Sequence, residues 1–283
     1  MAASPGLSAF YADLLKPGEA ERIVAGARPD LILHLAWCVE HGRFWTDPAN
    51  NDWLNASMAL AEAAVRNGVR RFIGVGTCFE YDWPADGECH ENATPLKSHT
   101  LYDMCKAGLR SRLDELCTAA GMDFAWARLF HLYGADEHPD RLVADIARRV
   151  GAGEPAACST GLALRDYMDV RDAGAGLVAL ALSNVTGSVN VASGQAVSIA
   201  EIARLIGDIA GRPDLIRLGE RPDRANEPAR IVADTHRLRC EIGFQPSISL
   251  RAGLTDAVAG WRSVRSTRCS ADAPKSDGVA DKP

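Results

Sequence analysis

The chain has 283 residues, 47% of them hydrophobic and 24% charged, with a formal net charge of −6 at pH 7. This composition is typical of a globular protein with one large domain or two modest ones, and the acidic balance argues against a nucleic-acid partner. No apolar run approaches the roughly 20 residues of a membrane helix, and the N-terminus lacks the basic and apolar regions of a secretory signal. We therefore expect a cytoplasmic protein without a membrane partner.

The first half of the chain alternates between predicted helices and short apolar strands. In chain order we predict a helix at 17–27, a strand at 31–37, a helix at 55–67, a strand at 71–77, a helix at 101–120 and a strand at 123–130. This alternation predicts a parallel sheet with right-handed crossovers, an α/β fold. Functional sites in such sheets lie at the carboxyl ends of the strands.

The second half of the chain is more mixed. An apolar helix ends the segment 165–182, a capping box opens a helix at 198–210, and two further helices are predicted at 234–244 and 249–262. We predict an incomplete Rossmann-like cofactor and catalytic part over 1–150 and a mainly substrate-binding part over 151–262. Some strands and helices of the second part are expected to return to the sheet. The polar segment 263–283 is predicted to be a disordered tail.

Eight cysteines are scattered along the chain, and no two of them form a C-x-x-C pair. Several stand in apolar segments, where a reduced cysteine behaves as a small hydrophobic residue. We therefore expect structural thiols in a reducing compartment, and neither a metal site nor a disulfide framework.

Tyr102 and Lys106 stand four positions apart in the predicted helix 101–120, which makes them neighbours on one face. A nearby ammonium favours the phenolate and lowers the pKa of a tyrosine, so the pair fits a tuned general acid/base. The alternative is a partly buried tyrosine beside a surface lysine. Thr77 ends a predicted strand, where its hydroxyl can bond the same substrate oxygen as Tyr102; the alternative there is a threonine that caps a turn.

Seven segments, in order, resemble the extended short-chain dehydrogenases/reductases, the group of nucleotide-sugar epimerases, dehydratases and ketoreductases. They are ADLL, PDLILHLAW, RRFIGVGTCFEYD, YDMCK, ARLFHLYG, RDYMDVRDAGAG and RANEPARIVAD, and they lie between Asp13 and Trp261. The resemblance implies a Rossmann-like parallel sheet flanked by helices, with a smaller mixed α/β substrate-binding region. The family's usual HLAA strand ends here in Trp37, and His131 replaces an asparagine.

The resemblance also implies residue roles. The catalytic residues would be Thr77, Tyr102 and Lys106. NAD or NADP would lie against Asp13, Leu14, Leu35, Ala36, Trp37, Tyr102 and Lys106. A nucleotide-diphosphate sugar would be held by His131, Arg165, Arg224 and Arg230. Hydride would pass between the nicotinamide ring and a sugar carbon, with Tyr102 moving the hydroxyl proton and Lys106 also binding the nicotinamide ribose.

Two positions narrow the expected activity. The family's dehydratases carry an Asp-Glu pair directly after the catalytic threonine, whereas this chain has Cys78 and Phe79 there. Glu80 comes one step later and would point to the other face of an extended segment. We therefore expect a 4-ketoreductase or an epimerase, and not a 4,6-dehydratase.

The glycine-rich phosphate loop that opens family members, G-x-x-G-x-x-G, does not precede the predicted strand at 31–37. We expect that the first βαβ unit is absent, that the strand at 31–36 has an unpaired apolar edge, and that NAD(P) binding and solubility are weak. Three explanations of the missing loop stay open: a truncated or mis-started gene product, a degenerate member of the family, or a protein with an altered cofactor site. The alternative function is therefore a non-catalytic remnant that binds a nucleotide sugar, and a homodimer is possible.

Overall fold

The computed structural model describes residues 7–225 and 227–271, and the chain divides into two compact units. The first unit takes its residues from Met1–Leu132, Ala163–Val197 and Pro228–Ser247, and the second from Tyr133–Leu162, Ser198–Glu227 and the segment from Ile248 onward. The sequence predicted parts divided at residue 150, with some strands and helices of the second part returning to the sheet. The units are discontinuous, because 163–197 and 228–247 belong to the first unit.

A parallel four-stranded sheet forms the centre of the first unit. Its strands are β1 (Leu31–His34), β2 (Arg71–Thr77), β3 (Asp123–Leu129) and β7 (Gly187–Val191), in the order β1-β2-β3-β7. This sheet confirms the predicted α/β class, and β7 is one of the strands that return from the second half of the chain. Within the described residues, β1 pairs only with β2.

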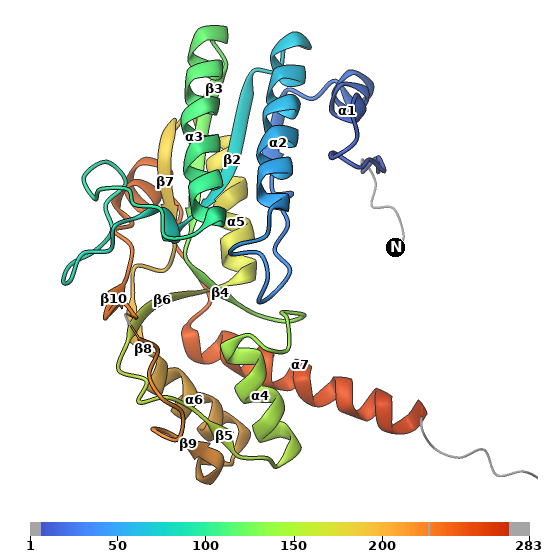
Figure 1. Cartoon of the computed structure of the whole chain (residues 1–283). Helices are drawn as coiled ribbons and strands as arrows, with labels where there is room; N and C mark the ends of the chain where they lie inside the picture. Colours follow the sequence, from blue (N-terminus) through green and yellow to red (C-terminus); the bar gives the residue numbers. More distant parts are fainter. Residues whose placement is uncertain (1–6, 226, 272–283) are drawn as a thin grey trace, which may run out of the picture. The chain divides into compact units, whose positions relative to one another are not determined.

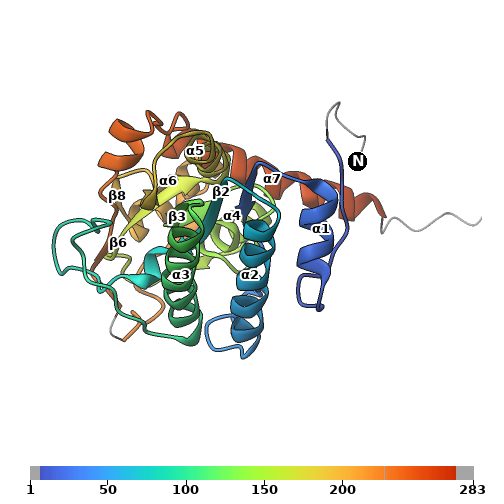
Figure 2. The same ribbon diagram turned by 90° about the horizontal axis from the view of Figure 1, so that it is seen from above.

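Helices cover both faces of this sheet (Figures 1 and 2). Helices α1 (Glu19–Ala27), α2 (Ala49–Arg66) and α3 (Leu101–Ala120) stand in a row on one face, and α5 (Val170–Leu182) covers the other. The first face buries a core of Leu60, Phe72, Leu109, Leu113 and Trp126, and the second buries Ile73, Leu177, Leu180, Val189 and Val191. Strands buried on both faces explain the continuous apolar runs of the sequence.

Helix α3 begins and ends where the sequence places its caps. Thr100 and Asp103 form a capping box at its start, and Gly121 ends it in the left-handed conformation with φ 66°. A residue with a Cβ is strained at that φ, so glycine fits the helix end. The caps therefore fix Tyr102 and Lys106 in the first two turns of the helix.

A second, smaller sheet continues the first unit. It has the order β10 (Arg230–Ile231), β6 (Leu164–Asp169) and β4 (His131–Tyr133), with β8 (Ala196–Ser198) also paired to β6. Two short irregular helices belong to the same unit, the 3₁₀ turn Cys78–Glu80 and the π-helix Arg237–Glu241. The helix predicted at 234–244 is therefore reduced to that π-helical turn.

The second unit is a packed set of helices. Its elements are α4 (Leu142–Ala152), α6 (Ile199–Ala210), α7 (Leu250–Ala271), the 3₁₀ turn Pro213–Leu215 and the strand pair β5 (Ala156–Ala157) and β9 (Ile216–Arg217). Helix α7 continues to Ala271, whereas the sequence predicted a disordered tail from residue 263; residues 272–283 lie outside the described residues. Over the ranges that the structure describes, no helix is long and apolar enough to cross a bilayer.

Candidate active site

The three predicted catalytic residues meet at the carboxyl end of β2. Thr77 is the last residue of that strand, and Tyr102 and Lys106 reach the same place from the first two turns of α3. The Lys106 ammonium donates a hydrogen bond to the carbonyl oxygen of Val75 at 2.9 Å, and the Thr77 hydroxyl is close enough to the Tyr102 phenol to lower its pKa. The sheet and the helix therefore hold a hydroxyl, a phenol and an ammonium in one buried cluster.

Trp37 is part of this cluster and replaces the small residue that the family resemblance predicts. The Lys106 ammonium lies 3.8 Å from the centre of the Trp37 ring system and 5.9 Å from the centre of the Tyr102 ring. Trp37 Nε1 donates to Asn50 Oδ1 at 2.8 Å, and the Asn50 amide in turn donates to the Phe44 carbonyl oxygen at 2.7 Å. The indole N–H is thus held by Asn50, and the face of the ring holds the ammonium by a cation–π contact.

Burial shifts the pKa of both members of the acid/base pair. It raises the pKa of Tyr102 above its ordinary value, with the charge of Glu80 as the second cause, while the hydrogen bond to Thr77 acts in the opposite direction. Burial lowers the pKa of Lys106 to about 7, although the charge of Glu80 opposes this. The pKa of Tyr102 is therefore raised in this structure, because burial removes the solvent that would stabilise the phenolate.

We expect the stability of the protein to rise with pH above about pH 7 through Lys106. Its pKa is about 7 in the folded chain against 10.5 ordinarily, so between these values only the unfolded state holds the proton. The free energy of unfolding therefore increases with pH across this window and is flat below it. Lys106→Met removes the titration, and urea unfolding across the window should show a smaller increase for that variant. Identical pH dependence of the two proteins would contradict the lowered pKa.

Glu80 lies in the core and not in an extended segment. Residues 78–80 form a 3₁₀ turn, in which the Glu80 carboxylate accepts hydrogen bonds from Thr77 N at 2.9 Å, Trp126 Nε1 at 3.1 Å and Arg128 Nε at 2.9 Å. The glycine at position 76 makes room for this arrangement, because a Cβ there would collide with Glu80 and Trp126. Glu80 is fully buried and engaged, so it supports the strand end that presents Thr77.

The predicted diphosphate residues are divided between the two units. His131 and two arginines belong to the first unit, and Arg224 is an exposed residue of the second. Arg165 donates to the carbonyl oxygens of Leu164 and Pro228, both at 2.8 Å, and Arg230 donates to that of Gly87 at 2.6 Å. These two guanidinium groups therefore already hold loops in place.

The predicted adenine segment borders a pocket of the first unit. Leu14 lines a cavity of about 380 Å³ together with Asn55, Ala56 and Ala59 of α2. Asp13 accepts a hydrogen bond from Leu15 N at 3.1 Å and so orders the turn beside this cavity. Lys16 and Asp52 also line this cavity, so its wall is partly polar and charged. Asn55 was not predicted, because a single asparagine in a helix forms no sequence pattern. Leu35 and Ala36 are exposed beyond the end of β1.

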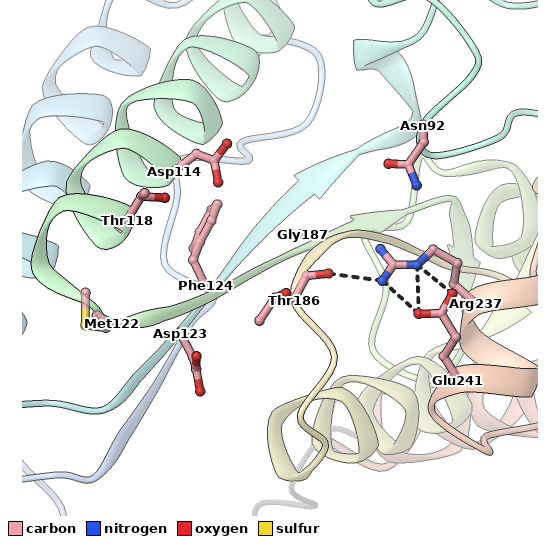
Figure 3. Close-up of a pocket in the computed structure, with 10 residues that line it drawn as sticks. All are labelled: Asn92, Asp114, Thr118, Met122, Asp123, Phe124, Thr186, Gly187, Arg237 and Glu241. Carbon is pink, nitrogen blue, oxygen red and sulfur yellow. Dashed lines mark hydrogen bonds and ion pairs between the residues drawn. The ribbon is translucent and has the colours of Figure 1, made fainter.

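A larger pocket, of about 530 Å³, lies elsewhere on the first unit (Figure 3). It is lined from the start of β3 by Asp123 and Phe124, from the start of β7 by Gly187, and by Arg237, which is paired with Glu241. Because the sheet is parallel, these amino ends lie at the edge opposite to Thr77. None of the predicted site residues lines this pocket.

A parallel sheet with helices on both faces and a threonine, a tyrosine and a lysine near its carboxyl edge is the arrangement of a Rossmann-like fold. The chain belongs to the NAD dependent epimerase/dehydratase family, whose model matches residues 2–192. This match confirms the resemblance seen in the sequence.

Relatives with different activities are similar to this chain. A UDP-glucose 4-epimerase of Rhizobium meliloti (strain 1021) is 28% identical over 274 residues, covering 87% of this chain and 80% of its own. A dTDP-glucose 4,6-dehydratase of Streptomyces griseus is 27% identical over 249 residues, covering 87% and 75%. A GDP-6-deoxy-D-mannose reductase of Pseudomonas aeruginosa is 26% identical over 253 residues, covering 83% and 81%. Sequence similarity by itself therefore does not exclude epimerase, dehydratase or reductase activity.

A solved structure agrees on the fold. The UDP-glucose 4-epimerase of Thermus thermophilus, in complex with NAD, superimposes with a TM-score of 0.80 at 23% identity and covers 92% of this chain and 86% of that one. The Rossmann-like fold predicted from the sequence is thereby confirmed.

Proposed function

We propose that this protein transfers a hydride at a sugar carbon of a nucleotide-diphosphate sugar, as a 4-ketoreductase or an epimerase. The convergence of Thr77, Tyr102 and Lys106 at the end of β2 carries the proposal. Bound NAD or NADP would accept or supply the hydride. The chain's own residues would orient the sugar oxygen and move its proton.

The raised pKa of Tyr102 supports the role of proton donor. With that pKa the phenol is protonated at neutral pH, so its hydroxyl can give a proton to a carbonyl oxygen that is being reduced. The Thr77 hydroxyl lies beside the phenol and can bond the same substrate oxygen. Trp37 and the Val75 carbonyl fix the ammonium of Lys106, which would face the nicotinamide ribose.

The residues after Thr77 favour reduction or epimerisation over dehydration. Elimination of water needs an acid and a base beside the sugar. Cys78 is a buried thiol whose pKa is raised by burial, Phe79 has no titratable group, and Glu80 is buried with Arg128.

Among the candidates for binding the diphosphate, Arg224 is favoured because its guanidinium is exposed, whereas Arg165 and Arg230 already donate hydrogen bonds to backbone carbonyls.

The test supplies the purified chain with NADH or NADPH and two kinds of sugar nucleotide. Loss of nicotinamide absorbance with a 4-keto-6-deoxy sugar nucleotide would identify a reductase. Interconversion of hexose nucleotides without net absorbance change would identify an epimerase. Formation of a 4-keto-6-deoxy product from a hexose nucleotide would contradict the proposal.

Binding without turnover is a second candidate, favoured by the indole of Trp37 against Lys106. A bulky ring there competes with a ribose for the ammonium. Calorimetry separates the two candidates: a sugar nucleotide that binds while NADH and NADPH do not would support the second one. Micromolar binding of NADH would contradict it.

A further inference from the structure

A row of aromatic rings leads away from the catalytic phenol across the first unit. It consists of Tyr102, Trp45, Phe79, His131 and Tyr167 and is called the aromatic strip below. Successive ring centres are 5.8, 4.8, 6.0 and 5.3 Å apart. Apart from Tyr102, the rings come from the segment after β1, the turn after β2, and strands β4 and β6, which the chain brings together only by folding.

The strip differs from the buried aromatic core of the same unit. Phe72, Tyr81 and Trp126 are fully buried, whereas Trp45 and Phe79 in the strip remain partly exposed. His131 and Tyr167 are also partly exposed. The strip therefore runs from the buried ring of Tyr102 past the partly exposed rings of Trp45 and Phe79 to His131.

We propose that the aromatic strip is the platform for the sugar ring and selects a hexose with an apolar C5 substituent, a 6-deoxyhexose, over a hexuronic acid. This proposal rests on the function proposed above, and Phe79 is its specificity-determining residue. Aromatic faces carry negative charge density, so they attract C–H groups and repel carboxylates. In the described part of the chain, neither Trp45 nor Phe79 carries a stacked lysine or arginine that would compensate a carboxylate.

The position of Phe79 along the strip supports this choice. Its ring contacts Trp45 on one side, Trp83 on a second and His131 on a third, with centre distances of 4.8, 5.5 and 6.0 Å. A sugar whose reacting oxygen faces Tyr102 and whose phosphates approach His131 would lie across the Phe79 ring. Burial of a methyl group against that ring is favourable, whereas an unpaired carboxylate there loses its hydration.

The experiment measures binding of three ligands that differ only at C6. They are UDP-6-deoxyglucose, UDP-glucose and UDP-glucuronate, measured by calorimetry and repeated with dTDP as the nucleotide; free UDP and dTDP report the nucleotide alone. We expect the 6-deoxy sugar to bind at least tenfold more tightly than the uronate. Phe79→Ala should weaken binding of the 6-deoxy sugar nucleotide about tenfold and leave binding of the free nucleotide unchanged. It should also reduce the preference for the 6-deoxy sugar over the uronate. Phe10→Ala, at an exposed phenylalanine outside the strip, is the matched control.

The binding preference of the wild-type protein and of the Phe79 variants tests the platform separately from the proposed function. Equal or tighter binding of the uronate by the wild-type protein would overturn the aromatic platform, even if Phe79→Ala fails to fold. If a folded Phe79→Ala variant keeps the full preference for the 6-deoxy sugar over the uronate, the platform is overturned as well. Phe79→Leu, which keeps an apolar side chain, should retain part of that preference. If no sugar nucleotide binds, the proposed function fails and the platform fails with it.

Discussion

Tyr102→Phe should lower turnover by roughly 10²–10⁴-fold with substrate affinity almost unchanged. The substitution removes only the phenol hydroxyl, and phenylalanine keeps the ring contacts with Phe44 and Trp45. The proposed proton donor is then missing from the site. Steady-state kinetics, with a sugar nucleotide that the wild-type protein turns over, measures both quantities.

Tyr11→Phe is the matched control for this substitution. Tyr11 is 91% exposed, so removal of its hydroxyl should leave turnover and affinity unchanged. Near-normal turnover of Tyr102→Phe would show that another group moves the proton. An equal loss in both variants would point to a general effect of preparing mutant protein.

Arg128→Met should destabilise the protein by about 3–5 kcal/mol, the loss typical of a buried ion pair that is broken on one side. Arg128 and Glu80 are 1% and 0% exposed, and Arg128 Nε lies 2.9 Å from Glu80 Oε2. Without the guanidinium, Glu80 keeps the N–H donors of Thr77 and Trp126 but remains a buried charge without a counterion. The Tyr81 hydroxyl also loses a donor at 3.0 Å. Urea unfolding measures the change in free energy.

Two comparisons make this expectation specific. Arg70→Met breaks an exposed ion pair with Asp30 and should cost less than about 1 kcal/mol. Adding Glu80→Gln to Arg128→Met removes the unpaired charge, so the double variant should lose less than the sum of the two single variants. A loss in Arg128→Met as small as in Arg70→Met would show that the buried pair does not anchor the turn after β2.

The elements around the site could be predicted because their signals are local. The strand predicted at 71–77 and the helix predicted at 101–120 coincide with β2 and α3, since continuous apolar runs, a capping residue and Gly121 act within a few positions. Helix α2 begins at Ala49, earlier than the predicted 55, because asparagine and aspartate obscure the apolar pattern of its first turn. Strand β1 ends at His34, before the predicted Trp37.

The environments of individual side chains could not be predicted from the sequence in the same way. The sequence predicted Trp37 as a cofactor-binding residue at a strand end and Glu80 as a group on the other face of an extended segment. Trp37 meets Lys106, and Glu80 meets Arg128, although the members of each pair are far apart in the chain. Such pairings depend on which strands become neighbours, and no local periodicity encodes that.

The sequence by itself determined the α/β class, the family and the spacing that puts Tyr102 and Lys106 on one helix face, because helix periodicity and motif order are properties of neighbouring residues. The tertiary structure decided the protonation of that pair, since a pKa depends on the solvent that packing removes. It also decided the return of β7 to the sheet and the assembly of the aromatic strip from distant segments. These features follow from contacts across the whole first unit, where burial and long-range pairing override local preference.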